Sequence, residues 1–203
     1  MSDKYSCYAE LLAREREGAS FRVRVKDRCS SVSVVAPHGG RIEPGTSETA
    51  ALIAAEDFSL YCFESLLPGG RLHITSARFD EPRGLALVEA SEIAIAIHGR
   101  ADAGDGQTIW MGGLRLDMRD RIGAALERAG FPVSVDHHMQ GRHPENICNR
   151  GRLRAGIQVE LPRSLRNRFR GDAFARDVFA KAVRGPLLDW EQKHSEALAY
   201  PAR

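Results

Sequence analysis

The chain has 203 residues, of which 43% are hydrophobic and 28% charged, enough for one well-buried core but too few for two full domains. We therefore expect a single domain over residues 1–203. The apolar fraction excludes intrinsic disorder, and the 19 glycines and 9 prolines, scattered without a period, exclude a collagen-like chain. A formal net charge of only +2 argues against nucleic acid as a partner, because domains that bind duplexes are strongly basic.

Two residue types narrow the class further. The basic residues are nearly all arginine, since lysine occurs only at positions 4, 26, 181 and 193. Arginine binds carboxylates and phosphates through paired hydrogen bonds, so this bias suits an anionic ligand, and equally a GC-rich genome. The cysteines contain no CxxC pair, which predicts buried, reduced thiols rather than a zinc knuckle or a redox site.

Hydrophobic periodicity and turn residues predict alternating helices and strands. In chain order we expect a helix at 5–17, strands at 21–25 and 33–36, a helix at 47–55, strands at 58–63 and 72–75, a helix at 82–90, strands at 93–97 and 108–111, a helix at 116–129, strands at 133–135 and 157–161, and a helix from 172 to about 198. Gly185-Pro186 marks a candidate interruption of the last helix.

The run Ile93-Ala94-Ile95-Ala96-Ile97 is apolar at every position. A strand that is apolar on both faces belongs in the covered middle of a mostly parallel sheet. Strands that alternate with helices predict an α/β fold, a three-layer sandwich in which helices flank a mixed, mostly parallel sheet.

Candidate functional side chains lie at the ends of the predicted apolar strands. His38 and Glu43 follow the strand at 33–36, His98 follows the central strand, and Glu160 lies near the end of the last strand. Because ligands of open α/β sheets bind at the carboxyl ends of strands, we expect these side chains to converge. Each has an ordinary alternative as a hydrogen-bonded loop or surface residue, although a carboxylate within a buried run is costly without a partner.

Two imidazoles and one carboxylate form the ligand set of a catalytic zinc site, which leaves one position open for water. The Gly39-Gly40 turn allows His38 and Glu43 to act from one loop, with His98 as the third ligand. Glu160 would take a proton from the water and pass it to a leaving amine. These residue types therefore predict metal-dependent amide hydrolysis.

Several short motifs occur in a fixed order: VVAPHGGRIEPGTSE at 34–48, LHITS at 72–76, FDEP at 79–82, IHG at 97–99, NICNRG at 146–151 and QVEL at 158–161. Together they resemble the poly-γ-glutamate hydrolase family of phage and bacterial proteins. The resemblance implies a zinc carboxypeptidase-like fold and zinc-dependent internal cleavage of γ-linked glutamate amides. Position by position, it implies that His38, Glu43 and His98 bind one zinc ion and that Glu160 is the base.

The substrate of such an enzyme carries one free α-carboxylate per residue, so a cleft lined by arginine is expected. The candidates for substrate binding are Arg41, Arg78, Arg83, Arg150 and Arg152. Arg150 ranks first, as a donor to the developing oxyanion or to a substrate carboxylate, because it lies on the loop that enters the Glu160 strand. The ordinary alternative is that about half of these arginines pair with surface carboxylates.

Two other functions fit parts of the pattern. A zinc-dependent cell-wall amidase would use a similar set of residues but would release peptide from glycan strands. An arginine-rich phage accessory protein that binds nucleic acid would lose affinity steeply with salt, although the arginines are spread along the chain. No run approaches the roughly 18 apolar residues of a membrane span, and the amino end has no signal-like core. We therefore expect no membrane partner, cytoplasmic synthesis, and release by lysis if a phage encodes the protein.

Overall fold

The computed structural model describes residues 3–199 and contains a seven-stranded mixed sheet. Its strands are β1 (Phe21–Lys26), β2 (Val32–Gly40), β3 (Ser59–Ser65), β4 (Ile93–Arg100), β5 (Ile109–Gly112), β6 (Val133–Ser134) and β7 (Ile157–Pro162), in the spatial order β1-β3-β2-β4-β7-β5-β6. The four central strands, β3, β2, β4 and β7, are parallel, whereas β1 and β5 run antiparallel to their neighbours β3 and β7. The predicted mixed, mostly parallel sheet is confirmed.

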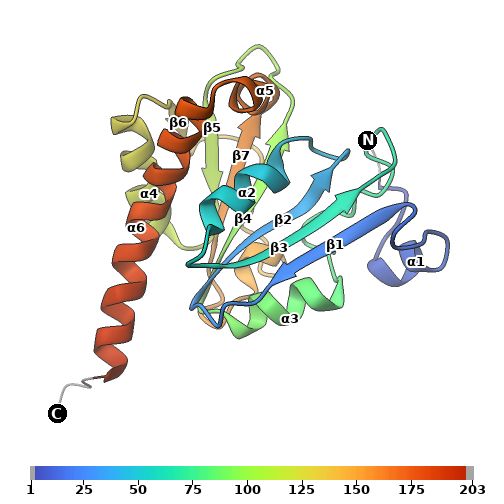
Figure 1. Ribbon diagram of the computed structural model, residues 1–203, viewed down its shortest axis with the longest axis horizontal. Coiled ribbons are helices and arrows are strands. Elements are labelled where there is room, and N and C mark those ends of the chain that lie inside the picture. Colours follow the sequence, from blue (N-terminus) through green and yellow to red (C-terminus); the bar gives the residue numbers. More distant parts are fainter. Residues whose placement is uncertain (1–2, 200–203) are drawn as a thin grey trace.

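Helices cover both faces of this sheet (Figure 1). They are α1 (Tyr8–Leu12), α2 (Thr46–Ala54), α3 (Pro82–Ala90), α4 (Leu116–Arg128), α5 (Arg163–Gly171), α6 (Ala173–Ala199) and the short 3-10 helix η1 (Ile147–Asn149). α2, α4, α5 and α6 pack against one face, and α1, α3 and η1 pack against the other. None of the described helices is both long enough and apolar enough to cross a membrane.

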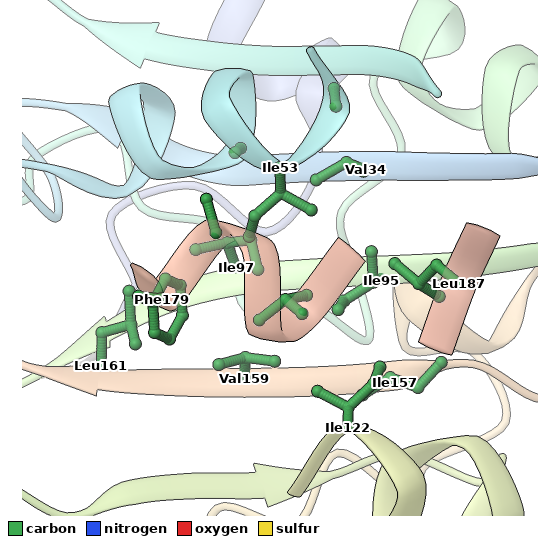
Figure 2. Close-up of a cluster of buried hydrophobic side chains, with 14 of the residues drawn as sticks. Val34, Ile53, Ile95, Ile97, Ile122, Ile157, Val159, Leu161, Phe179 and Leu187 are labelled. Atoms are coloured by element: carbon green, nitrogen blue, oxygen red, sulfur yellow. The ribbon is translucent and has the colours of Figure 1, made fainter. Parts of the chain in front are cut away.

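The alternation of side chains along β4 divides the core into two clusters. Ile95 and Ile97 belong to one cluster with Ile53 of α2 and Phe179 of α6, which Figure 2 shows, and all four are fully buried. Ala96, on the opposite face, belongs to the second cluster with the aromatic residues of β3. β4 is therefore covered on both sides, as its apolar sequence predicts.

Three of the expected elements differ in the structure, and one helix is additional. The first helix spans only Tyr8–Leu12 rather than 5–17. Residues 72–75 form no strand: Leu72 and Ile74 are buried against the second cluster from an irregular loop. α5 was not expected at all, and α6 continues through Pro186 without interruption. Burial of Val183 and Leu187 on either side of that proline holds the helix together despite the lost hydrogen bond.

Candidate metal centre and active site

The carboxyl ends of the parallel strands β2, β4 and β7 lie at one edge of the sheet, and the candidate residues gather there. His98 on β4 is the register partner of Glu160 on β7. Because Ile97 and Val159, the residues before them, face the first core cluster, strand alternation turns His98 and Glu160 together toward the opposite face.

An irregularity in β2 directs His38 toward the same place. The pairing of β2 with β3 shifts register between Ala36 and Gly39, around Pro37, which has no N–H to give to the sheet. A Cβ atom on Gly39 would lie 2.0 Å from Ser47 Oγ, and Gly40 has a φ of +64°. Both positions therefore require glycine, and together they form the turn that returns the chain toward Glu43.

Three ligand atoms from distant parts of the chain meet at this edge. His38 Nδ1 lies 3.1 Å from His98 Nδ1 and 3.2 Å from a Glu43 carboxylate oxygen. The other Glu43 oxygen lies 3.7 Å from His98 Nδ1. The ligand atoms of these residues lie within 4.8 Å of one another, and the two imidazoles are almost completely buried.

The outer ring nitrogens of the two histidines are occupied by other groups. His38 Nε2 is 2.8 Å from the carbonyl oxygen of Ile74, to which it donates, so Nδ1 is the ring nitrogen that faces His98 and Glu43. His98 Nε2 faces the Ser76 hydroxyl at 3.4 Å. Both inner nitrogens are thus oriented toward the shared space between the rings.

Glu43 is held in its ionised form. Its carboxylate accepts the Gly99 N–H at 2.7 Å. Burial opposes ionisation, but the charges and hydrogen bonds of His38 and His98 outweigh it and lower the pKa of Glu43. Burial also opposes the charged form of His98 and by itself lowers its pKa. The nearby carboxylates of Glu43 and Glu160 outweigh this effect, so the pKa of His98 is raised.

Arg166 of α5 fixes the backbone beneath the Glu43 loop. Its buried guanidinium donates to the carbonyl oxygens of Leu161, Pro44 and Arg100 at 3.1, 2.7 and 3.1 Å. It therefore joins the ends of β4 and β7 to the loop that carries Glu43.

The donor set fits a zinc ion. Two imidazole nitrogens and one carboxylate oxygen are the usual protein ligands of catalytic zinc. Two ligands bound tetrahedrally at the normal zinc–nitrogen length are about 3.3 Å apart, close to the 3.1 Å between the Nδ1 atoms. When one Nδ1 carries a proton, the same distance is met by a hydrogen bond from that nitrogen to the other, and a metal ion would replace that proton.

Glu160 lines the same cavity as the three candidate ligands, and one of its carboxylate oxygens forms no hydrogen bond within the described residues. Gln158 Nε2 donates to its Oε1 at 3.0 Å, and Asn146 in turn donates to Gln158. The Oε2 atom is buried and has no hydrogen-bond partner among the described residues. Burial raises the pKa of Glu160 to about 7, with Glu43 adding to the rise and His98 opposing it. Such a carboxyl is suited to accept and return a proton near neutral pH.

These groups line a cavity of about 330 Å³, which includes His38, Glu43, His98 and Glu160. His73 forms part of its wall: the ring centroid lies 4.0 Å from that of His38, and Nδ1 lies 2.6 Å from Asp3 Oδ1. Burial and the neighbouring His38 lower the pKa of His73, although Asp3 opposes this. His73 therefore packs against a candidate ligand without hydrogen bonding to it.

The structure does not bring most of the predicted substrate-binding arginines to this cavity. Arg150, expected as an oxyanion donor, pairs with Glu89 of α3 instead. Three more are paired and do not line the metal-site cavity: Arg152 with Glu92, Arg83 with Glu17 and Glu81, and Arg78 with Asp3. Asn146, at the start of the short helix η1, donates to Gln158, whereas Arg150, at its end, meets Glu89.

Arg41 lines a neighbouring cavity that also contains Glu43. Three residues at or near the site were not predicted from the sequence, namely Arg142 on the loop over the site, Gln158 and Arg166. Gln158 could have been found from its place two residues before Glu160, since strand alternation puts both on one face. Nothing in the sequence distinguished Arg142 or Arg166 from the other arginines.

Comparison with known proteins reveals close relatives. YndL, a UPF0714 protein of Bacillus subtilis (strain 168), is 39% identical over 174 residues, which cover 81% of this chain and 66% of YndL. The chain thus spans just under two thirds of the length of that relative. The zinc-free structure of YndL superposes with a TM-score of 0.82 at 33% identity, covering 92% of this chain and 98% of the other.

Other solved structures extend the similarity. A bacteriophage poly-γ-glutamate hydrolase superposes with a TM-score of 0.89 at 28% identity, covering 95% of this chain and all of the other. A protein of Burkholderia mallei named as a carboxypeptidase shares the fold, with a TM-score of 0.51 at 13% identity over 85% of this chain and 60% of that one. The expected carboxypeptidase-like fold is confirmed.

The model of the poly-γ-glutamate hydrolase family matches residues 5–179. This range contains all the motifs of the predicted resemblance and every residue of the candidate metal centre. The chain belongs to the poly-γ-glutamate hydrolase family.

Proposed function

We propose that this protein is a zinc-dependent hydrolase that cleaves γ-glutamyl amide bonds within poly-γ-glutamate. His38, Glu43 and His98 hold one metal ion, and Glu160 is the general base. The observation that carries the proposal is the buried, unpartnered Oε2 atom of Glu160 in the cavity that also contains the three ligand atoms. A buried polar atom without a partner is expensive in a purely structural role.

The chemistry divides between the metal and the chain. A bound zinc ion lowers the pKa of a coordinated water toward about 7 and polarises a carbonyl group. Glu160 accepts the proton of the attacking water at Oε2 and returns it to the nitrogen of the broken amide, which leaves as an amine. Gln158 holds the other oxygen of Glu160 throughout, so the proton-carrying oxygen keeps facing the reaction site.

Internal cleavage is supported by the neighbouring cavity. It shares Glu43 and His73 with the metal-site cavity. A polymer can therefore continue past the metal ligands instead of ending there. We propose that the enzyme cuts within the chain and does not remove terminal residues.

The test is incubation of the zinc-loaded protein with poly-γ-glutamate, followed by size-exclusion chromatography and assay of free glutamate. We expect the mean chain length to fall before glutamate appears. Glu160→Gln should lower kcat by about 100-fold or more while retaining zinc, and chelation should abolish cleavage until zinc is restored.

Glu92→Gln is the matched control, because Glu92 lies before β4 and pairs with Arg152 far from the cavity. This variant should cleave like the wild type. Full activity of Glu160→Gln would contradict the assignment of the base. Release of peptide from cell-wall glycan strands, without shortening of the polymer, would favour an amidase.

A further inference from the structure

A second, larger cavity adjoins the metal centre on the side of α5. Its volume is about 960 Å³, and it shares Glu43 and His73 with the metal-site cavity. Arg41, Arg71, Arg163 and Arg170 line it. We call these four residues and the space they surround the arginine groove.

These arginines differ from most others in the described chain because they form no salt bridge with a carboxylate. Within the described part of the chain, eight arginines form neither a salt bridge nor a side-chain hydrogen bond. Five of the eight line the two cavities, namely the four of the arginine groove and Arg142 in the metal-site cavity. The other three are Arg14, Arg16 and Arg128. The free guanidinium groups are thus concentrated around the proposed active site.

Two of the groove arginines form a row along α5. Arg163, Asn167 and Arg170 are exposed and line the groove, and their spacing places them on one face of the helix. Arg170 follows Arg163 by seven positions, which is about 10 Å along the helix axis. A γ-linked glutamate adds five backbone bonds, or about 6 Å when extended. The row therefore spans close to two residues of such a polymer.

The carboxylates in the groove are already satisfied and do not cancel this charge. Asp3 is hydrogen-bonded to His73, Thr75 and Arg78, and these contacts lower its pKa despite burial. Glu43 belongs to the metal centre. The groove is thus a positive channel next to the metal ligands, whereas among the described residues Arg142 is the one unpaired arginine that lines the metal-site cavity.

We infer that the arginine groove holds two or more consecutive residues of the polymer on one side of the bond to be cut, with Arg71, Arg163 and Arg170 paired to their α-carboxylates. The inference rests on the proposed function and deepens it. Arginine and carboxylate groups form bidentate hydrogen bonds, which favour a chain with one carboxylate per residue over a neutral peptide. Binding across the active site is therefore asymmetric, and substrates too short to reach α5 lose most of this contribution.

The test compares Arg163→Gln/Arg170→Gln with Arg128→Gln, an exposed, unpaired arginine on α4 outside both cavities. We expect the double variant to raise KM for long poly-γ-glutamate about tenfold with kcat nearly unchanged, and to change kcat/KM for a γ-linked diglutamate by less than twofold. Arg128→Gln should match the wild type. Equal KM values for the double variant and Arg128→Gln would overturn the inference.

A binding measurement separates this inference from the proposed function. Each substitution is placed in the Glu160→Gln background, and binding of fluorescent poly-γ-glutamate is followed by anisotropy at several salt concentrations. A tenfold weaker affinity of the double variant supports the groove even if the wild type cleaves nothing, an outcome that would defeat only the proposed function. Undiminished affinity would defeat the groove even if the wild type cleaves the polymer well.

Discussion

Replacing Glu160 by glutamine should make the metal-free protein more stable at neutral and alkaline pH. Burial raises the pKa of Glu160 from 4.5 to about 7, and Glu43 adds to the rise while His98, Arg100 and Arg166 oppose it. The native state therefore holds this proton more tightly than the unfolded chain does. The resulting stability is present below the unfolded pKa and is lost as pH rises through the folded pKa.

The size of the effect follows from the two pKa values. The interval from 4.5 to about 7, at about 1.4 kcal/mol per pH unit, corresponds to about 3 kcal/mol. Glutamine has no proton to lose and retains an oxygen that can accept the hydrogen bond from Gln158. The difference in free energy of unfolding between Glu160→Gln and wild type should therefore change by about 3 kcal/mol from pH 4.5 to pH 8, in favour of Glu160→Gln.

The assay is urea denaturation in the presence of a chelator at a series of pH values. Glu92→Gln, made at an ion-paired carboxylate outside the cavity, gives the effect of the same chemical change away from the site. A stability difference between Glu160→Gln and wild type that stays constant from pH 4.5 to 8 would refute the reasoning, because it would mean that Glu160 is ionised as readily in the folded protein as in the unfolded chain.

Three other substitutions test residues that surround the candidate active site. Gly99→Ala would place a Cβ atom 2.5 Å from Arg166 Cζ, so urea unfolding should report a loss of about 2 kcal/mol; unchanged stability would show that Arg166 moves aside freely. Gln158→Leu removes the hydrogen bond to Glu160 and should lower kcat about tenfold at unchanged zinc content, whereas an unchanged kcat would remove Gln158 from the mechanism. Arg150→Gln should leave kcat/KM for the polymer within about twofold of wild type, since its partner lies outside the cavity; a large loss would restore its predicted role.

The sequence identified the strands that carry the site because their physical signals are local. The run Ile93 to Ile97 is apolar at every position and forms the covered strand β4. Apolar strands followed by His38 and His98 indicated where polar side chains would gather, because parallel strands end at one edge. The convergence of His38, Glu43 and His98 could be expected on this ground.

Other features could not be predicted because they depend on contacts between distant segments. α5 has only Leu165 and Phe169 buried as apolar anchors among four arginines, so its helical period is weak in the sequence. Arg163 and Arg170 were missed with it. Leu72 and Ile74 alternate with polar residues, and this pattern predicted a strand. In the structure they lie on a loop and pack into the second core cluster.

The sequence also did not show which arginines pair with carboxylates. Arg150 follows Asn146 by four residues within one motif, but only Asn146 reaches the chain of hydrogen bonds to Glu160. Arg150 instead meets Glu89, which is distant in sequence. Which arginines remain unpaired is a property of the whole fold, and it could be read only from the structure.

The most direct test of the metal centre is the zinc content of the dialysed wild type, His98→Ala, Glu160→Gln and His194→Ala, measured by elemental analysis. His194 stacks on Trp190 of α6 and serves as the matched control. We predict one zinc ion per chain in every protein except His98→Ala, which should bind none. Equal zinc in His98→Ala and wild type, or no zinc in the wild type, would contradict the account.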